Sequence, residues 1–244
     1  MRHLIWLSLA WSFPAHAVLF QVGPTRAFTT LQDAVNAASA GDEIEVEDGV
    51  YDGDLSIDKD LTIYSRTGAV YTYFAGDITL SGVEVSFTGF TMTPANRAFD
   101  VNSGATLHLD DITVTSVTQA TDGIGVHAVG ASLVSISNST FVDLNADSGS
   151  GAALHITASD LVLHDVTFER CNGVEAGAVY VDDAGVSMTG VTFTDNQATS
   201  ANFGNGGGLL AVNASTADLT STDFDSNIGA GMGGGMQMTG GTLI

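Results

Sequence analysis

The sequence predicts an all-β protein whose short parallel strands stack coil on coil, with one helix capping the N-terminal end. Segments in which apolar and polar residues alternate recur along the chain, and equivalent residues lie 24 to 31 positions apart. A unit of that length cannot bury its own apolar face and strand edges, whereas stacked copies can. The 29 glycines and 3 prolines suit many strands joined by tight turns. We therefore expect a solenoid rather than an antiparallel sandwich.

Residues 1–17 are predicted to be a signal peptide. A short basic region at 1–3 precedes an apolar run at 4–13, and Ala-His-Ala at 15–17 fits a cleavage site with small residues. The apolar run is too short to span a membrane, and no later segment of the chain is long enough. We therefore expect an exported protein whose folded domain comprises residues 18–244.

The segment Phe28–Ala38 is the best helix candidate, and Thr29 or Thr30 can cap it. Its apolar residues fall on one face, at i, i+3, i+4 and i+7: Leu31, Ala34, Val35 and Ala38. Alternating strands are expected after it, at 43–46, 55–57 and 61–63. An amphipathic helix placed before the first strand would cover the open end of a stacked β-structure.

Residues 28–65 resemble the opening of right-handed parallel β-helix proteins of the pectin-lyase-like superfamily. The matching positions are Gly41, Asp42, Ile44, Val46, Gly49, Tyr51, Leu55, Ile57, Lys59, Leu61 and Ile63. The resemblance implies a right-handed parallel β-helix with an N-terminal capping helix. It implies no single activity, because the superfamily contains lyases, hydrolases, epimerases, adhesins and accessory proteins.

From Gly82 onward, six rungs can be aligned. Each rung contains a pair of apolar residues that lie five positions apart. The pairs are Val85 and Phe90, Leu109 and Val114, Ile136 and Phe141, Leu163 and Phe168, Met188 and Phe193, and Leu219 and Phe224. A turn-prone residue lies between the two members of each pair, except in the first rung, where Phe87 takes that place. About seven rungs are expected in all. Another rung begins at 240–244, so we expect the β-helix domain to be truncated at its C-terminal end.

Two rungs share a Phe-x-x-Asn pattern, at Phe193 and Phe224, and glycine-rich segments precede the third strand of several rungs. This pairing resembles the repeats of polymorphic outer-membrane proteins, which are bacterial surface β-helix proteins. The resemblance implies a secreted protein or one at the cell surface or outer membrane of a bacterium. The asparagines and glycines themselves suit tight bends and close packing.

Charge limits the partners that this chain can bind. The sequence has 28 acidic and 6 basic residues, which gives a formal net charge of −22. Such a surface repels nucleic acid and anionic lipid, and it opposes polyuronic acids unless cations bridge the charges. The single cysteine, Cys171, cannot form an internal disulfide and is expected to be buried and inert.

The third strands of successive rungs predict an outward column of side chains. If the flanking apolar residues point inward, the column is Asp100, His127, His155, Tyr180, Ala211 and Gln237. Asp100, His127, His155 and Tyr180 are the catalytic candidates, because a carboxylate, two imidazoles and a phenol in line can serve acid–base chemistry on a polysaccharide or bind a metal. The alternative is that strand alternation places polar residues outside in any case.

Calcium is the one cofactor that the sequence leaves open, and no other is expected. The candidate ligands are aspartates that cluster in the middle of the chain, since carboxylates bind hard cations: Asp110, Asp111, Asp143, Asp147 and Asp165.

Two functions remain from the sequence. The first is an exported or cell-surface protein that acts in adhesion or in contact with a carbohydrate or cell-surface ligand, without evident catalysis. The second is a polysaccharide lyase, glycoside hydrolase or epimerase on the same fold, for which the column is the candidate site. The absence of matching catalytic motifs and the negative charge favour the first. The longer loop Thr194–Gly206 is where a partner is expected to touch.

Overall fold

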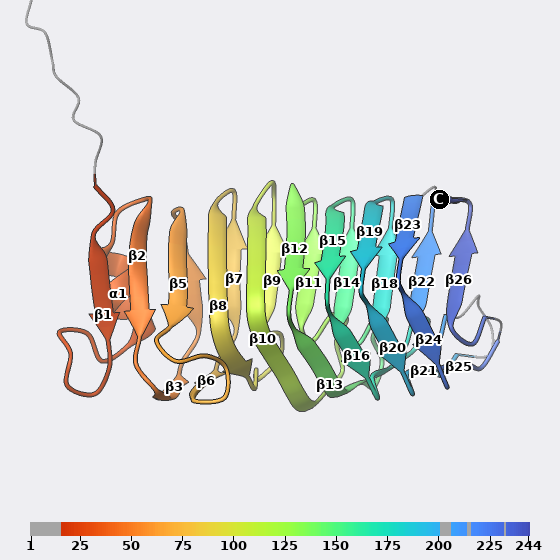
Figure 1. Cartoon of the computed structure of the whole chain (residues 1–244), viewed down its shortest axis with the longest axis horizontal. Coiled ribbons are helices and arrows are strands. Elements are labelled where there is room, and N and C mark those ends of the chain that lie inside the picture. The colour runs from red at the N-terminus through yellow and green to blue at the C-terminus, as the bar shows by residue number, and fades with distance from the viewer. Residues whose placement is uncertain (1–15, 201–205, 214–215, 232) are drawn as a thin grey trace, which may run out of the picture.

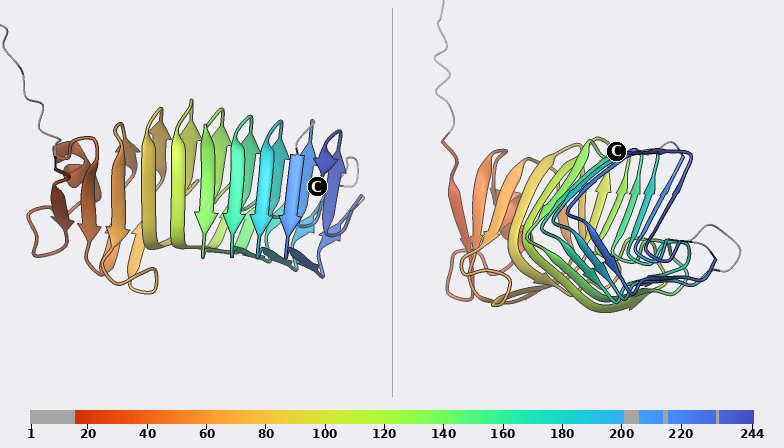
Figure 2. Two further views of the ribbon diagram at one scale, coloured as in Figure 1. Left: turned by 45° about the horizontal axis from the view of Figure 1, so that its top comes forward. Right: turned by 45° about the vertical axis from the view of Figure 1, so that its right-hand side comes forward.

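The computed structural model describes residues 16–200, 206–213, 216–231 and 233–244, and these residues form a parallel β-helix wound about one long axis (Figure 1). Its strands form a 19-stranded sheet, here called sheet A, and an eight-stranded sheet, called sheet B. Sheet A bends around two sides of the solenoid, and the coils stack directly behind one another (Figure 2). The eight strands of sheet B mark eight turns in the described residues, one more than expected. The all-β, right-handed parallel β-helix is confirmed.

The first side of sheet A comprises β1 (Leu19–Val22), β2 (Asp42–Val46), β5 (Leu61–Ser65), β8 (Glu84–Met92), β10 (Thr106–Gln119), β12 (Leu133–Ser137), β15 (Asp160–His164), β19 (Gly185–Thr189), β23 (Thr216–Thr220) and β27 (Thr242–Leu243). The second side comprises the C-terminal parts of β8 and β10 with β3 (Gly49–Asp52), β6 (Thr72–Ala75), β13 (Thr140–Ala146), β16 (Thr167–Glu169), β17 (Asn172–Gly173), β20 (Thr192–Thr194), β21 (Gln197–Ala198), β24 (Asp223–Asp225) and β25 (Ile228–Gly229). Sheet B comprises β4 (Leu55–Ile57), β7 (Ile78–Ser81), β9 (Phe99–Asn102), β11 (Val126–Val129), β14 (Leu154–Thr157), β18 (Val179–Asp182), β22 (Leu209–Val212) and β26 (Met236–Thr239).

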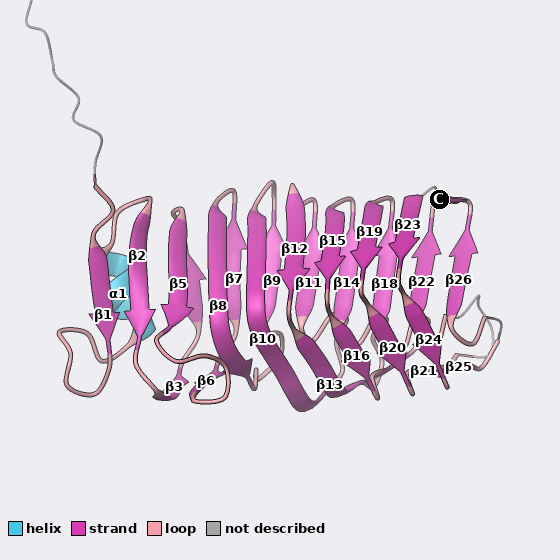
Figure 3. Cartoon of the chain, in the orientation of Figure 1, coloured by secondary structure: helices cyan, strands magenta, loops and turns pink. Residues whose placement is uncertain are grey.

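The capping helix α1 (Leu31–Ala37) lies at the N-terminal end of the solenoid (Figure 3). The Thr30 hydroxyl caps it by accepting a hydrogen bond from the Asp33 backbone N–H at 3.2 Å. Its buried face carries Leu31, Ala34 and Val35, as the spacing predicts. The expected order is wrong in one respect: β1 precedes the helix and pairs with β2, so the helix follows the first strand.

The register of the first aligned rung differs from the expected one by two residues. Phe87, rather than Val85, pairs with Leu109, and Met92, rather than Phe90, pairs with Val114. The difference in register is due to the bend that lies between the two apolar residues of each rung. Gly89 has a φ of 81° and occupies the position that turn residues such as Asp111, with a φ of 51°, occupy in later rungs. Phe87 is therefore a core residue and not an exception at the turn.

Phenylalanines stack on one another inside the solenoid. The ring centroids of Phe141, Phe168, Phe193 and Phe224 are separated by 5.3, 4.9 and 4.8 Å from turn to turn. Offset stacking of this kind adds to the free energy gained by burying each ring. The recurring phenylalanine of the sequence therefore specifies the core.

A buried asparagine, Asn196, forms hydrogen bonds with backbone groups at the bend that follows Phe193. The Asn196 side chain accepts a hydrogen bond from the Cys171 N–H at 2.9 Å and donates to the Phe168 carbonyl at 3.0 Å and to Asn227 Oδ1 at 2.9 Å. Cys171 is buried, and burial raises the pKa of its thiol to about 12. It is therefore an unreactive core residue, as expected.

Two expectations fall on residues outside those described. The predicted signal peptide, residues 1–17, lies almost wholly outside them, and the loop Thr194–Gly206 lies partly outside them. Within the described part of the chain, no helix is both long and apolar enough to cross a membrane.

We predict that Phe168→Ala lowers the free energy of unfolding by about 3–5 kcal/mol, because it removes a fully buried ring that stacks on two neighbours. Urea unfolding followed by circular dichroism would measure the change. The matched control is Thr167→Ala on the outward side of the same strand, which should change stability by less than about 0.5 kcal/mol. A loss below about 1 kcal/mol for the phenylalanine variant would contradict the role of the stack.

Candidate functional site

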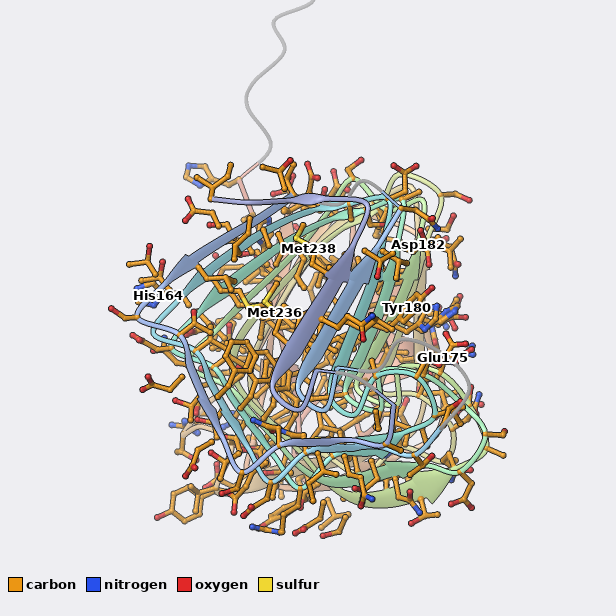
Figure 4. The ribbon with its side chains drawn as sticks, turned by 90° about the vertical axis from the view of Figure 1, so that its right-hand side faces the viewer. His164, Glu175, Tyr180, Asp182, Met236 and Met238 are labelled. Carbon is orange, nitrogen blue, oxygen red and sulfur yellow. The ribbon has the colours of Figure 1, made fainter. Side chains whose placement is uncertain are left out.

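The outward column on sheet B exists, with one correction. Strand pairing puts Asp100, His127, His155 and Tyr180 side by side on four successive turns. The next residue in register is Leu210 and not Ala211, because β22 begins at Leu209 and the register position shifts by one residue, and the Leu210 side chain is buried. Gln237 follows Leu210, as expected. Figure 4 looks along the solenoid. In this view Tyr180 points away from the side on which Met236 and Met238 lie, which is the side of the core.

Asp100 and His127 form a hydrogen-bonded pair. The distance from Asp100 Oδ1 to His127 Nδ1 is 2.9 Å. An ionised carboxylate only accepts hydrogen bonds, so Nδ1 is the donor to such a carboxylate, and in the tautomer with its proton on Nδ1 the Nε2 atom has a lone pair. Arg97 lies 4.0 Å from Asp100 and donates from Nε to the Asp122 carbonyl at 3.1 Å. The arginine therefore links the column to the neighbouring loop.

His155 lies between two other rings. Its ring centroid is 5.5 Å from that of His127 and 4.6 Å from that of Tyr180, with an interplanar angle of 12° to the tyrosine. Burial lowers the pKa of His155, because it disfavours the charged ring more than the Asp122 carboxylate, 3.8 Å away, favours it. The imidazole is therefore neutral at pH 7, and its Nδ1 lies 3.2 Å from the Ser150 carbonyl.

Tyr180 ends the run of stacked rings. Burial raises its pKa to about 12, and the charges of Asp182 and Glu175 act in the same direction. Asp182 and Glu175 lie on the same side of the solenoid as Tyr180, on its strand and in the preceding loop (Figure 4). The phenol therefore keeps its proton at pH 7 and can donate a hydrogen bond.

Two glycines bring the neighbouring loop close to the column. A Cβ atom on Gly123 would lie 2.9 Å from the backbone nitrogen of His155, and one on Gly151 would lie 2.7 Å from the backbone nitrogen of Tyr180. Both residues have positive φ, 55° and 63°. The residue before each glycine, Asp122 or Ser150, is thereby held beside the rings.

The sequence reasoning missed the loop residues of this site, namely Arg97, Asp122 and Ser150. They are connected to each other, since Asp122 Oδ1 accepts a hydrogen bond from the Ser150 N–H at 2.6 Å. The signal that could have found two of them is the polar residue directly before each glycine of the turn, at Gly123 and Gly151.

The candidate calcium ligands do not come together. Each aspartate has another role: Asp110 accepts from Ser137 and Asn138, Asp111 from the Ala69 N–H, Asp143 from Arg170, and Asp147 from Asn145, while Asp165 lies beside His164. Within the described ranges, no three His, Cys, Asp or Glu side chains are grouped so that they could hold a metal ion. Calcium binding stays a prediction.

The chain was compared with known proteins. Residues 52–231 match the family model described as "Right handed beta helix region". No curated protein matches. Solved structures with a similar fold include a pectin methylesterase from Aspergillus niger (14% identity, 94% of this chain and 86% of that one, TM-score 0.49) and pectin methylesterase PemA from Erwinia chrysanthemi (13%, 87% and 82%, 0.48). A further pectin methylesterase, solved in complex with a hexasaccharide, has 12% identity over 87% and 82% of the two chains and a TM-score of 0.43. At these identities the likeness concerns the fold alone. The resemblance to polymorphic outer-membrane proteins stays a prediction.

We predict that His155 makes stability depend on pH. Its pKa is lower in the folded chain than the unfolded value of about 6.5, so its contribution is complete above that pH and is lost as the pH falls toward the folded pKa. His155→Phe keeps a ring in the stack and removes the titration. The stability of the wild type relative to this variant should therefore fall between pH 7.5 and pH 5.

Urea unfolding at several pH values would measure this difference. The control is His164→Phe, because the His164 side chain is 60% exposed on the other sheet. A pH dependence of the His155→Phe difference no larger than that of the control would contradict the prediction.

Proposed function

Because the chain belongs to the family of right-handed β-helix regions, in which successive turns set equivalent side chains in straight columns, we propose that it is an exported or cell-surface protein that holds a neutral polysaccharide or cell-surface glycan. The site is the outward face of sheet B, and the role is adhesion or surface contact without catalysis. One observation carries the proposal: Asp100, His127, His155 and Tyr180 are in register on four successive turns.

The geometry of the column suits a polymer. Adjacent strands lie about 4.8 Å apart, so the polar groups form a ladder with a regular step. The rings of His127, His155 and Tyr180 stack on one another, so a ligand can reach them only at their edges, and the His127 and His155 side chains are 18% and 16% exposed. These edges carry imidazole nitrogens and a phenol hydroxyl, which donate to or accept from sugar hydroxyls. A chain of sugar units presents hydroxyls at regular intervals and can follow such a ladder.

The negative charge around the column favours a neutral glycan over an anionic one. Four carboxylates lie on or beside the column, and among the described residues Arg97 is a cation that contacts it: the carboxylates are those of Asp100, Asp122, Glu175 and Asp182. Together with a net charge of −22, this excess of carboxylates repels polyanions. Carboxylates that are already ionised are good acceptors for neutral hydroxyls.

We predict that Tyr180→Phe weakens glycan binding about three- to tenfold, because it removes one hydrogen-bond donor and keeps the ring in the stack. Calorimetry with neutral hexasaccharides of β-1,4-linked glucose, mannose, xylose and N-acetylglucosamine would measure the affinities. His127→Ala should cost at least as much, and His164→Ala on sheet A is the matched control that should bind as the wild type does. Equal affinities for all four proteins would contradict the proposed site.

A second candidate function rests on the hydrogen bond between Asp100 and His127. A carboxylate that orients an imidazole through Nδ1 leaves Nε2 free to take a proton, which is the role of a general base. The pair therefore suits a polysaccharide hydrolase, lyase or epimerase, for which the same face of sheet B would be the active site.

If the protein turns over a polysaccharide, Asp100→Asn should lower kcat by about a hundredfold or more, because the amide no longer holds the imidazole in that orientation with a negative charge. Assays for new reducing ends and for unsaturated uronates, together with NMR for a change in the configuration of the sugar, would measure turnover, again with His164→Ala as the control. Binding without turnover in the wild type would exclude this second function and leave the first.

A further inference from the structure

A second surface of the molecule, on β3 and β6 of sheet A, carries exposed aromatic and apolar side chains. Val50, Tyr71 and Tyr73 are 77%, 58% and 41% exposed. We propose that this Tyr71–Tyr73 surface is a second binding site for a neutral polysaccharide, whose sugar rings pack their C–H faces on the two phenol rings. The inference rests on the proposed function in taking a neutral glycan as the ligand.

The strand register places these side chains on one face. Tyr73 pairs with Val50 of the preceding turn, and the ladder extends to Tyr71, whose carbonyl accepts a hydrogen bond from the Gly49 N–H at 3.0 Å. Thr72 and Phe74, the residues between and after the tyrosines, are buried. Both tyrosines therefore point outward. Tyr73 is on β6 and Tyr71 is in the turn directly before it, so the two rings lie two residues apart at the start of the strand, with Val50 beside Tyr73.

The backbone under this surface is held by hydrogen bonds. The Thr72 and Ser65 hydroxyls are 2.7 Å apart, and the Thr91 hydroxyl donates to the Ala69 carbonyl at 2.8 Å. The Ala69 N–H in turn donates to an Asp111 oxygen at 3.2 Å. Because the segment that leads into β6 is fixed in this way, a ligand would not have to order it on binding.

Two hollows lie at or beside β3, the strand that pairs with β6. One, of about 270 Å³, is lined by Pro24, Thr29, Thr30 and the residues of β3, including Val50. The other, of about 460 Å³, is lined by Glu47, Asp48, Arg66 and Thr67. Asp48 directly precedes β3, so both hollows border the strand that pairs with β6. Hydroxyl, carboxylate and guanidinium groups are thus present near β3, where they can bind the hydroxyls of a sugar whose ring packs on the tyrosines.

The charge of the chain decides between possible occupants. A second copy of this protein would bring another net charge of −22 to the surface, and anionic lipid or nucleic acid would be repelled in the same way. A neutral glycan has an apolar face for the tyrosines and hydroxyls for the hollows, and it carries no charge to be repelled. It is therefore the occupant that the surface fits.

The two binding surfaces lie on different sheets. The column is on sheet B, whereas β3 and β6 belong to the second side of sheet A near the N-terminal end (Figure 1). A single chain can therefore hold two glycan strands at once. Such bivalent contact raises the apparent affinity for an insoluble polysaccharide above that of either site.

The test uses the full chain on insoluble cellulose, xylan, mannan and chitin, and on the soluble hexasaccharides of the same sugars. The double variant Tyr71→Ala/Tyr73→Ala should bind the preferred polysaccharide about tenfold or more weakly, as truncated aromatic anchors do. Tyr71→Phe/Tyr73→Phe keeps both rings and should bind within about threefold of the wild type. Tyr64→Ala, which changes an outward tyrosine of β5, is the matched control.

The outcomes separate this inference from the proposed function. If Tyr180→Phe weakens binding and the Tyr71/Tyr73 alanine variant does not, the inference is overturned and the sheet B site stands. If only the alanine variant weakens binding, the inference stands and the sheet B site fails. Absence of binding to every polysaccharide overturns both. A loss of self-association in sedimentation, with unchanged glycan binding, would show that a second copy occupies the surface and would also overturn the inference.

Discussion

The parallel hydrogen-bond ladder between successive turns is the constraint on which the rest of this structure depends. Each turn places its residues directly beside those of the turn before, so any residue type that recurs in the sequence becomes a column in space. Inside, this gives the stack of phenylalanines from Phe141 to Phe224. Outside, it gives the row from Asp100 to Tyr180. Core and candidate site have the same geometric origin.

The same ladder makes like charges on adjacent turns destabilising, because they would lie about 4.8 Å apart and repel each other. This acidic chain avoids that arrangement at several positions by pairing a carboxylate with a different group one turn away. Asp143 contacts Arg170, Glu45 accepts from Gln21, and Asp100 contacts His127. The histidine beside Asp100 is therefore also a structural partner. A ligand on this face would meet an imidazole whose orientation is already fixed.

Most of the fold could be predicted from the sequence, because the spacing between the recurring phenylalanines equals the number of residues in one turn of the solenoid. The errors of register arose where apolar residues offered two alignments. Val85 and Phe90 have the same spacing as Phe87 and Met92, and only Gly89 distinguishes them. At β22, two consecutive leucines left alternation unable to choose between Leu210 and Ala211.

One part of the candidate site could be predicted from the sequence, and another part could not. The column lies on strands with regular alternation, so its four polar members could be predicted. Arg97, Asp122 and Ser150 come from loops, whose lengths differ from turn to turn, so period alone cannot align them. Their position depends on close backbone packing at Gly123 and Gly151.

The two proposed binding surfaces use aromatic rings in opposite ways, and the ladder explains why. Rings on adjacent turns stack face to face, as His155 and Tyr180 do, so the column has only ring edges left for a ligand. Tyr73 lies on β6 and Tyr71 in the turn directly before it, and Val50 and Thr91 flank Tyr73 on the neighbouring turns, so no aromatic partner is paired with its ring there. The recognition proposed at sheet B therefore depends on hydrogen bonds at the ring edges. The recognition proposed at β6 depends on packing against the ring faces, so the two surfaces would bind different parts of the same kind of polymer.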